Sequence, residues 1–359
     1  MNIVFISTYG VACGIATYTE ALAKSLKKAG HTVSILAEIK DKQPQQQTID
    51  GIPVYRIWAR SLHNKTLYGL GAILRAIDSS EAKPDVVHFQ HEFGIFPNSN
   101  GFIELVAALE QRNIRVVTTL HTVLAPPEGV GFFQNLGGCA IVHTDEAMAA
   151  LAAHSDARGV YVIPHGLSLG ETNPPRETAA PNILVPGFIS KNKAPLEIVE
   201  AFAAAIAAHG PCGTLRFMGL CRDEQLQQEL EQTISRYYCL DEYIKLDLAF
   251  HSEAIMAKAF YDADFVILGG EELSSYSASG QLSGCISHAV PVLAKNTPIY
   301  RSGGDCGVVL YEEGELWRYI KAFKSVELRK RLHEKHLAVR ECRTWEIVAE
   351  RHERIYRNV

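Results

Sequence analysis

The chain has 359 residues, which exceeds one typical domain and favours two domains of about 170 residues each. A hydrophobic content of 47% is sufficient for packed cores. The formal net charge of −5 argues against nucleic-acid binding, which normally requires a basic surface.

The eight cysteines are scattered and form no CxxC pair, a pattern typical of reduced thiols in the cytosol. The opening segment MNIVFIS lacks the charged region of a targeting signal and is followed at once by a glycine turn. We therefore expect a first strand there, and a cytoplasmic protein. No apolar run reaches the ~20 residues that a membrane span needs.

Short apolar runs alternate with helical patterns along the first half of the chain. The first strand is expected at 3–7, and the helix after Gly14 carries an apolar face of Ile15, Tyr18, Leu22 and Leu26. Further strands are expected at 32–36, 54–57, 85–89, 115–120, 140–143 and 160–164. Alternating strands and helices indicate a parallel, doubly wound sheet. The polar run 41–50 is expected to be a surface loop.

A polar, proline-rich linker near 168–180 precedes a second series of strands and helices. Strands are expected at 183–186, 214–218, 243–246, 265–268 and 291–294, and helices at 195–208, 225–236, 253–261 and 280–289. The charged tail 327–359 looks helical. The sequence thus predicts an α/β protein with Rossmann-like domains at 1–170 and 171–342, and a helix at 343–359 that crosses back to the first domain.

Two segments of the second half place candidate anion-binding groups at the carboxyl ends of strands, where open α/β sheets bind ligands. Ser277, Ser279 and Gly280 open a helix, so free N–H groups there favour a phosphate. An ordinary serine-capped helix is the alternative. Lys193 lies at the positive end of another helix, which is unfavourable unless an anion binds. A solvated surface lysine is the alternative there.

The first half carries candidates of the same kind. Gly10 and Gly14 permit close backbone approach to a ligand, but there is no GxGxxG, so a dinucleotide site is disfavoured. His121 ends one predicted strand, and the residues 90–92 end another. The sequence HFQHE is not HExxH on a helix, so no metal site is expected. The DxD triplet 262–264 leads from a helix into a strand, and we do not interpret it as a metal motif.

Taken together, these segments resemble the family 4 glycosyltransferases, which are retaining enzymes with the GT-B fold of two Rossmann-like domains facing each other across a cleft. The resemblance covers essentially the whole chain. It includes, in order, the Gly10/Gly14 turn, AGHTVSIL, PDVVHFQ, VVTTLHT, AIVHTDEAM, VIPHG, PGFISKNKAPLEIVEAF and YDADFVIL followed by SGQLSGCISHAVPVLA.

The resemblance implies a nucleoside diphosphate sugar as substrate, with UDP-sugars favoured over GDP-sugars, and no cofactor or metal. The first domain would supply Gly14 to the phosphates and His121 to the transferred sugar. The acceptor, a saccharide or lipid-linked saccharide, would lie over Gln90, His91 and Glu92. The implied donor-binding residues of the second domain are Gly187, Lys191, Lys193, Ser279, Gly280, Gln281 and Leu282, with Lys193 also catalytic.

The sequence departs from the family pattern at three positions. Phe188 stands where an arginine usually follows the glycine, so Lys191, Lys193 or Arg301 must carry the phosphate charge. Tyr276 and Gly284 stand where the family has paired glutamates, the second of which usually binds the ribose. Glu271 and Glu272, slightly upstream, are candidate substitutes.

The resemblance therefore predicts a hexosyltransferase of bacterial surface polysaccharide or glycolipid synthesis. The alternatives are a sugar-nucleotide epimerase of the same fold and a non-catalytic homologue that acts as a partner subunit. A basic segment with Arg56, Trp58, Arg60, His63 and Lys65 is a candidate for peripheral contact with anionic lipids at the inner membrane face, with a solvated loop as the alternative.

Overall fold

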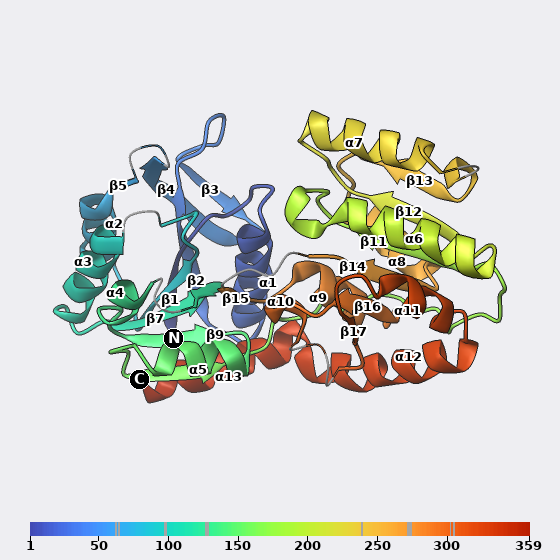
Figure 1. Cartoon of the computed structure of the whole chain (residues 1–359). Helices are drawn as coiled ribbons and strands as arrows, with labels where there is room; N and C mark the ends of the chain where they lie inside the picture. Colours follow the sequence, from blue (N-terminus) through green and yellow to red (C-terminus); the bar gives the residue numbers. More distant parts are fainter. Residues whose placement is uncertain are drawn as a thin grey trace. The chain divides into compact units, whose positions relative to one another are not determined.

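The structure is a computed structural model that divides into two compact units, each described here by itself (Figure 1). It describes residues 1–61, 63, 65–96, 99–125, 129–237, 240–270, 275–301, 303 and 306–359. Unit 1 consists of 1–166, the segment 275–278 and 345–359, and unit 2 contains the other described residues of 167–344. The segment 275–278 was expected in the second domain, but it belongs to unit 1.

Unit 1 is built on a mostly parallel sheet. Its strands are β1 (Asn2–Ser7), β2 (Thr32–Glu38), β3 (Gln46–Ile49), β4 (Ile52–Ser61), β5 (Thr66–Tyr68), β6 (Val86–His91), β7 (Arg115–Leu120), β9 (Cys139–Val142) and β10 (Gly159–Val162). The order is β10-β9-β7-β6-β1-β2-β4-β3, and both β3 and β5 pair antiparallel with β4. A separate antiparallel pair joins β8 (Thr122–Leu124) to β15 (Ser275–Ser277).

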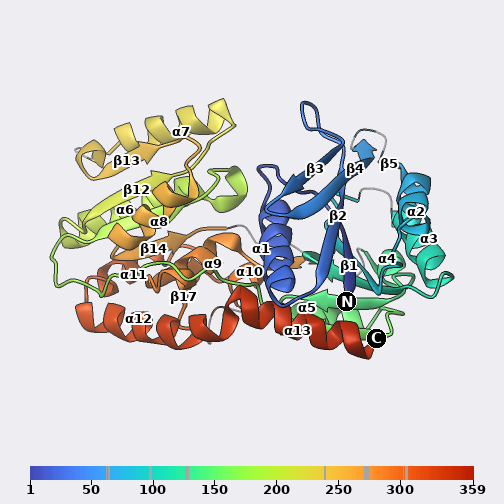
Figure 2. The same cartoon turned by 180° about the vertical axis from the view of Figure 1, so that it is seen from behind.

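Helices cover both faces of this sheet, because alternate side chains of a strand point to opposite sides. The helices of unit 1 are α1 (Gly14–Lys28), α2 (Leu70–Asp78), α3 (Ser99–Glu110), α4 (Val130–Phe133), α5 (Asp145–Ala152) and α13 (Trp345–Asn358). In β1, Val4 and Ile6 pack in the core with α2 to α5, whereas Ile3 and Phe5 pack in the core with α1 and α13. Figure 2 shows α13 running along the underside of unit 1, with the last residue at its end.

Unit 2 repeats this plan with a parallel sheet in the order β13-β12-β11-β14-β16-β17. Its strands are β11 (Asn182–Pro186), β12 (Thr214–Met218), β13 (Ile244–Asp247), β14 (Phe265–Leu268), β16 (Val292–Lys295) and β17 (Val309–Tyr311). Its α-helices are α6 (Pro195–His209), α7 (Glu224–Ser235), α8 (Glu253–Asp262), α9 (Gly280–Ser287), α10 (Pro298–Arg301), α11 (Leu316–Ala322) and α12 (Val326–Arg340). Its 3-10 turns are η1 (Lys191–Lys193), η2 (Leu240–Glu242) and η3 (Glu341–Arg343). Helices α6, α7 and α11 pack on one face, and α8 and α9 on the other.

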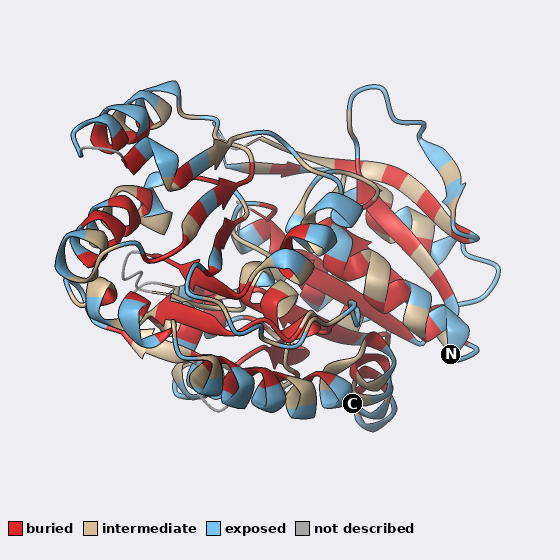
Figure 3. Cartoon of the chain, turned by 90° about the vertical axis from the view of Figure 1, so that its right-hand side faces the viewer, coloured by how far each residue is buried: buried red, intermediate tan, exposed pale blue. Residues whose placement is uncertain are grey.

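The predicted strands and helices are confirmed to within a few residues, because both faces of each sheet are buried and the strands read as apolar runs (Figure 3). Two predictions about the surface of unit 1 are wrong. The run 41–50 contains strand β3 and is not only a loop. The basic segment lies largely on strand β4, where Arg56 and Trp58 are buried, so these two side chains cannot contact lipid head groups.

Arg56 has a structural use inside unit 1. Its guanidinium donates to the Tyr9 carbonyl at 2.9 Å and to the Glu38 carbonyl at 3.2 Å. A second cation, Arg60, lies 3.1 Å from the Glu38 carboxylate. Arg56 and Arg60 therefore stabilise the turn after β1 and the end of β2.

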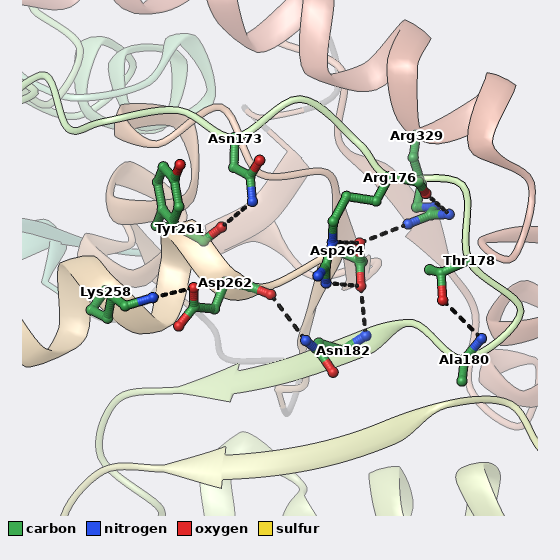
Figure 4. Close-up of polar contacts among 10 residues, drawn as sticks. All are labelled: Asn173, Arg176, Thr178, Ala180, Asn182, Lys258, Tyr261, Asp262, Asp264 and Arg329. Atoms are coloured by element: carbon green, nitrogen blue, oxygen red, sulfur yellow. Dashed lines mark hydrogen bonds and ion pairs between the residues drawn. The ribbon is translucent and has the colours of Figure 1, made fainter.

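The predicted linker is fixed to unit 2 by a buried ion-pair network (Figure 4). The Asp264 carboxylate, 3% exposed, accepts from Arg176 of the linker at 2.8 Å and lies 3.1 Å from the guanidinium of Arg329, which is fully buried. It also accepts the amide of Asn182 at 2.7 Å. The carboxylate of the DxD triplet that points inward is thus a structural anchor for the linker.

Within the part of the chain that the structure describes, no helix combines the length and the apolar character needed to cross a membrane.

Candidate active site

Lys193 lies beside the carboxyl ends of the unit 2 strands, at the end of η1 and just before α6. Its Nζ donates to the Tyr300 hydroxyl at 3.3 Å and lies 5.7 Å from the centre of the Tyr300 ring. Among the described residues no carboxylate forms an ion pair with it, and burial lowers its pKa. A partly buried cation without an acidic partner is favourable only if an anion binds there.

Tyr300 links this lysine to the helix start that the sequence singled out. The Tyr300 side chain is fully buried, and its hydroxyl donates to the Gly269 carbonyl at 3.2 Å. Burial raises the pKa of Tyr300, and a hydrogen bond with Ser279 opposes that rise. Tyr300 was not predictable from the sequence, because a tyrosine on a four-residue helix carries no signal of its own.

Ser279 is the N-cap of α9, and its Oγ accepts the amide of Leu282 at 3.2 Å. The Leu282 amide is therefore used by the cap, whereas the amides of Gly280 and Gln281 have no partner among the described residues. Leu282 thus drops out of the predicted set of four anion-binding amides. The free N–H groups at the start of the helix remain. These groups and the helix dipole favour an anion.

Gln281 ties this helix start to the end of β11. Its Nε2 donates to the carbonyl of Pro186, and its Oε1 is buried without a hydrogen-bond partner in the described part of the chain. Gly187 has φ +88°, and an added Cβ would overlap the Gln281 side chain. Glycine is required at this position both for its backbone conformation and for the space that Gln281 fills.

Gly284 is explained by packing. A Cβ built at this position would lie 3.0 Å from Cζ and 3.1 Å from Cε2 of the Phe260 ring, which packs against α9. A larger residue at this position would require the Phe260 ring to shift. The other departure, Tyr276, lies on β15 and pairs with Val123 of β8 inside unit 1. Neither position offers a carboxylate for a ribose.

The remaining donor-side candidates differ in their surroundings. Lys191 is exposed, with its Nζ 3.8 Å from Asp223. Arg301 donates to the Asn296 side chain at 2.9 Å. Phe188 is 54% exposed beside Lys193, and both line a narrow cavity together with Gln281. Glu272 and its neighbour 271 lie outside the described residues.

His121 of unit 1 is held by a chain of buried hydrogen bonds. Its Nε2 lies 2.8 Å from the side-chain amide of Gln90, and its Nδ1 lies 3.3 Å from Nε2 of His143. The chain ends where His143 Nδ1 donates to the Ile163 carbonyl at 2.9 Å. Burial, and then the neighbouring histidines, hold the pKa of His121 well below its usual range. The ring is therefore neutral and oriented, a geometry that suits positioning more than proton transfer.

The three residues 90–92 do not form one surface. Gln90 and His91 are fully buried, and the His91 ring stacks on Phe132 at 4.7 Å between ring centres. Burial lowers the pKa of His91 to about 3, and neither ring nitrogen has a partner among the described residues. Only Glu92 is partly exposed, and its carboxylate accepts from Thr122 at 2.7 Å. The side chain of His91 lies in the core rather than on an acceptor surface.

Gly14 is the first residue of α1, and an added Cβ there would meet no atom within 4 Å. A side chain would fill open space in front of the helix N-terminus, and glycine keeps that space free. Gly10, in the preceding turn, has φ +63°. The turn that leads into α1 thus has open space beside Gly14.

A cavity of about 490 Å³ in unit 2 lies away from these groups. It is lined by Asn182 and Thr214, the first residues of β11 and β12. Lys193 and Gln281 lie instead near the last residue of β11, Pro186. We therefore place the candidate site at the carboxyl ends of the strands.

The chain resembles solved glycosyltransferases over its whole length. A glycosyltransferase from Rickettsia africae matches with a TM-score of 0.73 and 15% identity, covering 99% of this chain and 98% of that one. Anabaena Alr3699/HepE in complex with UDP and glucose matches with a TM-score of 0.71 and 15% identity over 100% of both chains. A UDP-forming trehalose-phosphate synthase from Burkholderia xenovorans matches with a TM-score of 0.74 and 11% identity over 99% of both.

These likenesses define the fold as GT-B. Residues 12–171 match the model of Glycosyltransferase Family 4. A search of curated protein sequences finds no match. The family match of residues 12–171 and the GT-B fold of the whole chain confirm the resemblance seen in the sequence.

Proposed function

We propose that the chain is a retaining, metal-independent hexosyltransferase that uses a nucleoside diphosphate sugar and a hydroxyl acceptor. The observation that carries this proposal is the group formed by Lys193, Tyr300 and the start of α9. Within the described residues it combines a lysine ammonium without an acidic partner and helix N–H groups without hydrogen-bond partners. Such groups suit a diphosphate, whose negative charge increases as the sugar departs.

In this mechanism Lys193 stabilises the leaving diphosphate together with the amides of Gly280 and Gln281. The Tyr300 hydroxyl orients the lysine, because the two atoms lie 3.3 Å apart. Gly14 and His121 serve the phosphates and the transferred sugar, as the family resemblance implies. Fixed donors aimed at developing charge take the place of a metal ion.

UDP is the first nucleotide to test. The Anabaena relative in the GT-B fold was solved with UDP and glucose, and the Burkholderia relative is UDP-forming. The starch synthase from Arabidopsis, which matches with a TM-score of 0.69, was bound to ADP and acarbose. We propose a hexose donor of the UDP type and an acceptor in bacterial surface polysaccharide or glycolipid synthesis at the cytoplasmic side.

The first test is calorimetric titration of the protein with UDP, GDP and ADP in the presence of EDTA. Micromolar binding of one nucleotide identifies the donor class, and its sugars are then screened against saccharide acceptors. The anomeric configuration of the product, read by NMR, tests retention. A product that forms from the donor without any acceptor would indicate an epimerase.

The role of Lys193 is tested by Lys193→Ala, with Lys258→Ala as a matched control. The control lysine lies 5.5 Å from the centre of the Tyr261 ring but is paired with Asp262. Lys193→Ala should abolish turnover with the fold intact, and the control should retain it. Unchanged turnover in Lys193→Ala would remove this lysine from the mechanism.

A non-catalytic homologue is the second candidate. The packing of Phe260 against Gly284 favours it, since the position where the family usually has a glutamate for the ribose carries no side chain and is closely packed by the Phe260 ring. Absence of binding to all three nucleotides would support this second function.

A further inference from the structure

Phe188 and Arg222 form a stacked pair at the carboxyl-end edge of the unit 2 sheet. The guanidinium carbon of Arg222 lies 5.6 Å from the centre of the Phe188 ring. Phe188 follows the end of β11, and Arg222 lies in the loop that follows the neighbouring strand β12. Phe188 is 54% exposed, and the guanidinium lies over one face of its ring.

The two loops that carry the pair are joined beyond the ends of the strands. The amide of Gly187 donates to the Met218 carbonyl at 2.9 Å, and the amide of Ile189 donates to the Leu220 carbonyl at 3.1 Å. An added Cβ at Gly219, where φ is +149°, would overlap the backbone of Gly187. The loops are therefore held together by their backbones, and the stacked pair has a defined place.

Arg222 is a cation without an acidic partner among the described residues. The next residue, Asp223, uses its carboxylate to cap α7, accepting from Leu226 at 3.0 Å, and lies 3.8 Å from Lys191. By contrast, Arg318 of α11 stacks on Trp317 at 5.3 Å but pairs with a carboxylate, that of Glu315, at 3.2 Å. Of these two arginines, Arg222 is the one without a carboxylate partner in the described part of the chain.

We propose that Arg222 binds the diphosphate of the donor and that Phe188 positions its guanidinium. This inference rests on the proposed function. Phe188 and Lys193 line the same narrow cavity, so a diphosphate held by Lys193 lies beside the ring on which Arg222 stacks. A guanidinium presents a planar set of donors that matches two phosphate oxygens at once. Arg222 thus supplies the positive charge that the residue after Gly187 does not.

The test is calorimetric titration of the full chain and its variants with UDP, inorganic pyrophosphate and uridine. Arg222→Ala should weaken binding of UDP and of pyrophosphate by about 10- to 100-fold, the range expected when a hydrogen bond to a charged group is lost. Uridine binding should not change. Arg318→Ala, which removes the stacked arginine that already has a carboxylate partner, should bind all three as the wild type does.

The double variant Phe188→Arg/Arg222→Ala returns a guanidinium to the neighbouring loop and should recover part of the lost UDP affinity. If Arg222→Ala binds UDP like the wild type, or loses uridine as strongly as UDP, the inference is overturned while the proposed function stands. If the wild type binds pyrophosphate through Arg222 but no nucleotide, the proposed function falls, and the assignment of Arg222 to a donor diphosphate falls with it. Absence of binding to all three probes would overturn both.

Discussion

Replacement of His91 by leucine should make unit 1 more stable at neutral pH and less sensitive to acid. The His91 ring is fully buried among phenylalanines and stacks on Phe96 and Phe132. Both ring nitrogens lack partners among the described residues. Leucine is of similar size and has no polar atom to bury, so the variant should gain about 1 kcal/mol at pH 7.5.

The pH dependence follows from the pKa of this ring. Burial lowers the pKa of His91 from an ordinary value of 6.5 to about 3, so the folded protein does not take up this proton in the window between them. The unfolded chain does take it up below pH 6.5. Stability is therefore lost as pH falls, by about 1.4 kcal/mol per pH unit for each such proton. Between pH 6.5 and pH 5 the variant should lose about 2 kcal/mol less than the parent.

The assay is urea denaturation in a Trp317→Phe background, which leaves Trp58 and Trp345 of unit 1 as the tryptophan probes. His63→Leu removes a histidine at an exposed position and serves as the control. The control should keep the pH slope of the parent, whereas His91→Leu should reduce it by one proton. An equal slope in both variants, or a marked loss of stability in His91→Leu at pH 7.5, would refute the reasoning.

Three further predictions concern unit 2. Burial lowers the pKa of Lys193, and only the charged form of this lysine attracts phosphate. As the pH rises, the affinity for UDP should therefore begin to fall at a lower pH than it would with a lysine of ordinary pKa. In Lys193→Arg, which stays charged, titration between pH 7 and pH 9.5 should show no such fall. Gly284→Glu should destabilise unit 2 by about 1–3 kcal/mol in urea denaturation, because its side chain would clash with Phe260. Adding Phe260→Ala should relieve part of that clash. A Gly284→Glu variant as stable as the wild type would contradict the packing argument. Asp264→Asn should lower the free energy of unfolding by about 3 kcal/mol or more in the same assay, since it leaves the Arg329 guanidinium buried without its counter-ion. An unchanged urea midpoint would show that this ion pair does not contribute to stability.

The order of most strands and helices was predictable from the sequence, because these elements carry a local signal of apolar runs or helical periodicity. Strands such as β6 and β14 are buried on both faces, and this leaves little ambiguity. Short edge strands such as β3 and β5 carry no such signal, since they are largely exposed or only a few residues long. Arg56 and Trp58 read as a surface patch because the sequence does not reveal which face of β4 the core covers.

The candidate site was likewise predictable only in part from the sequence. Lys193 and Ser279 were recognisable, because a helix start is a local feature, whereas Gly187 was predicted only from the family resemblance. Tertiary structure alone brought Tyr300 between the lysine and the serine, placed Arg222 on Phe188, and filled the space at Gly284 with Phe260. These contacts join residues that are far apart in the chain, so no local sequence pattern predicts them. The sequence by itself determined the elements and the class of protein, whereas packing decided which side chains are buried, paired or left available for an anion.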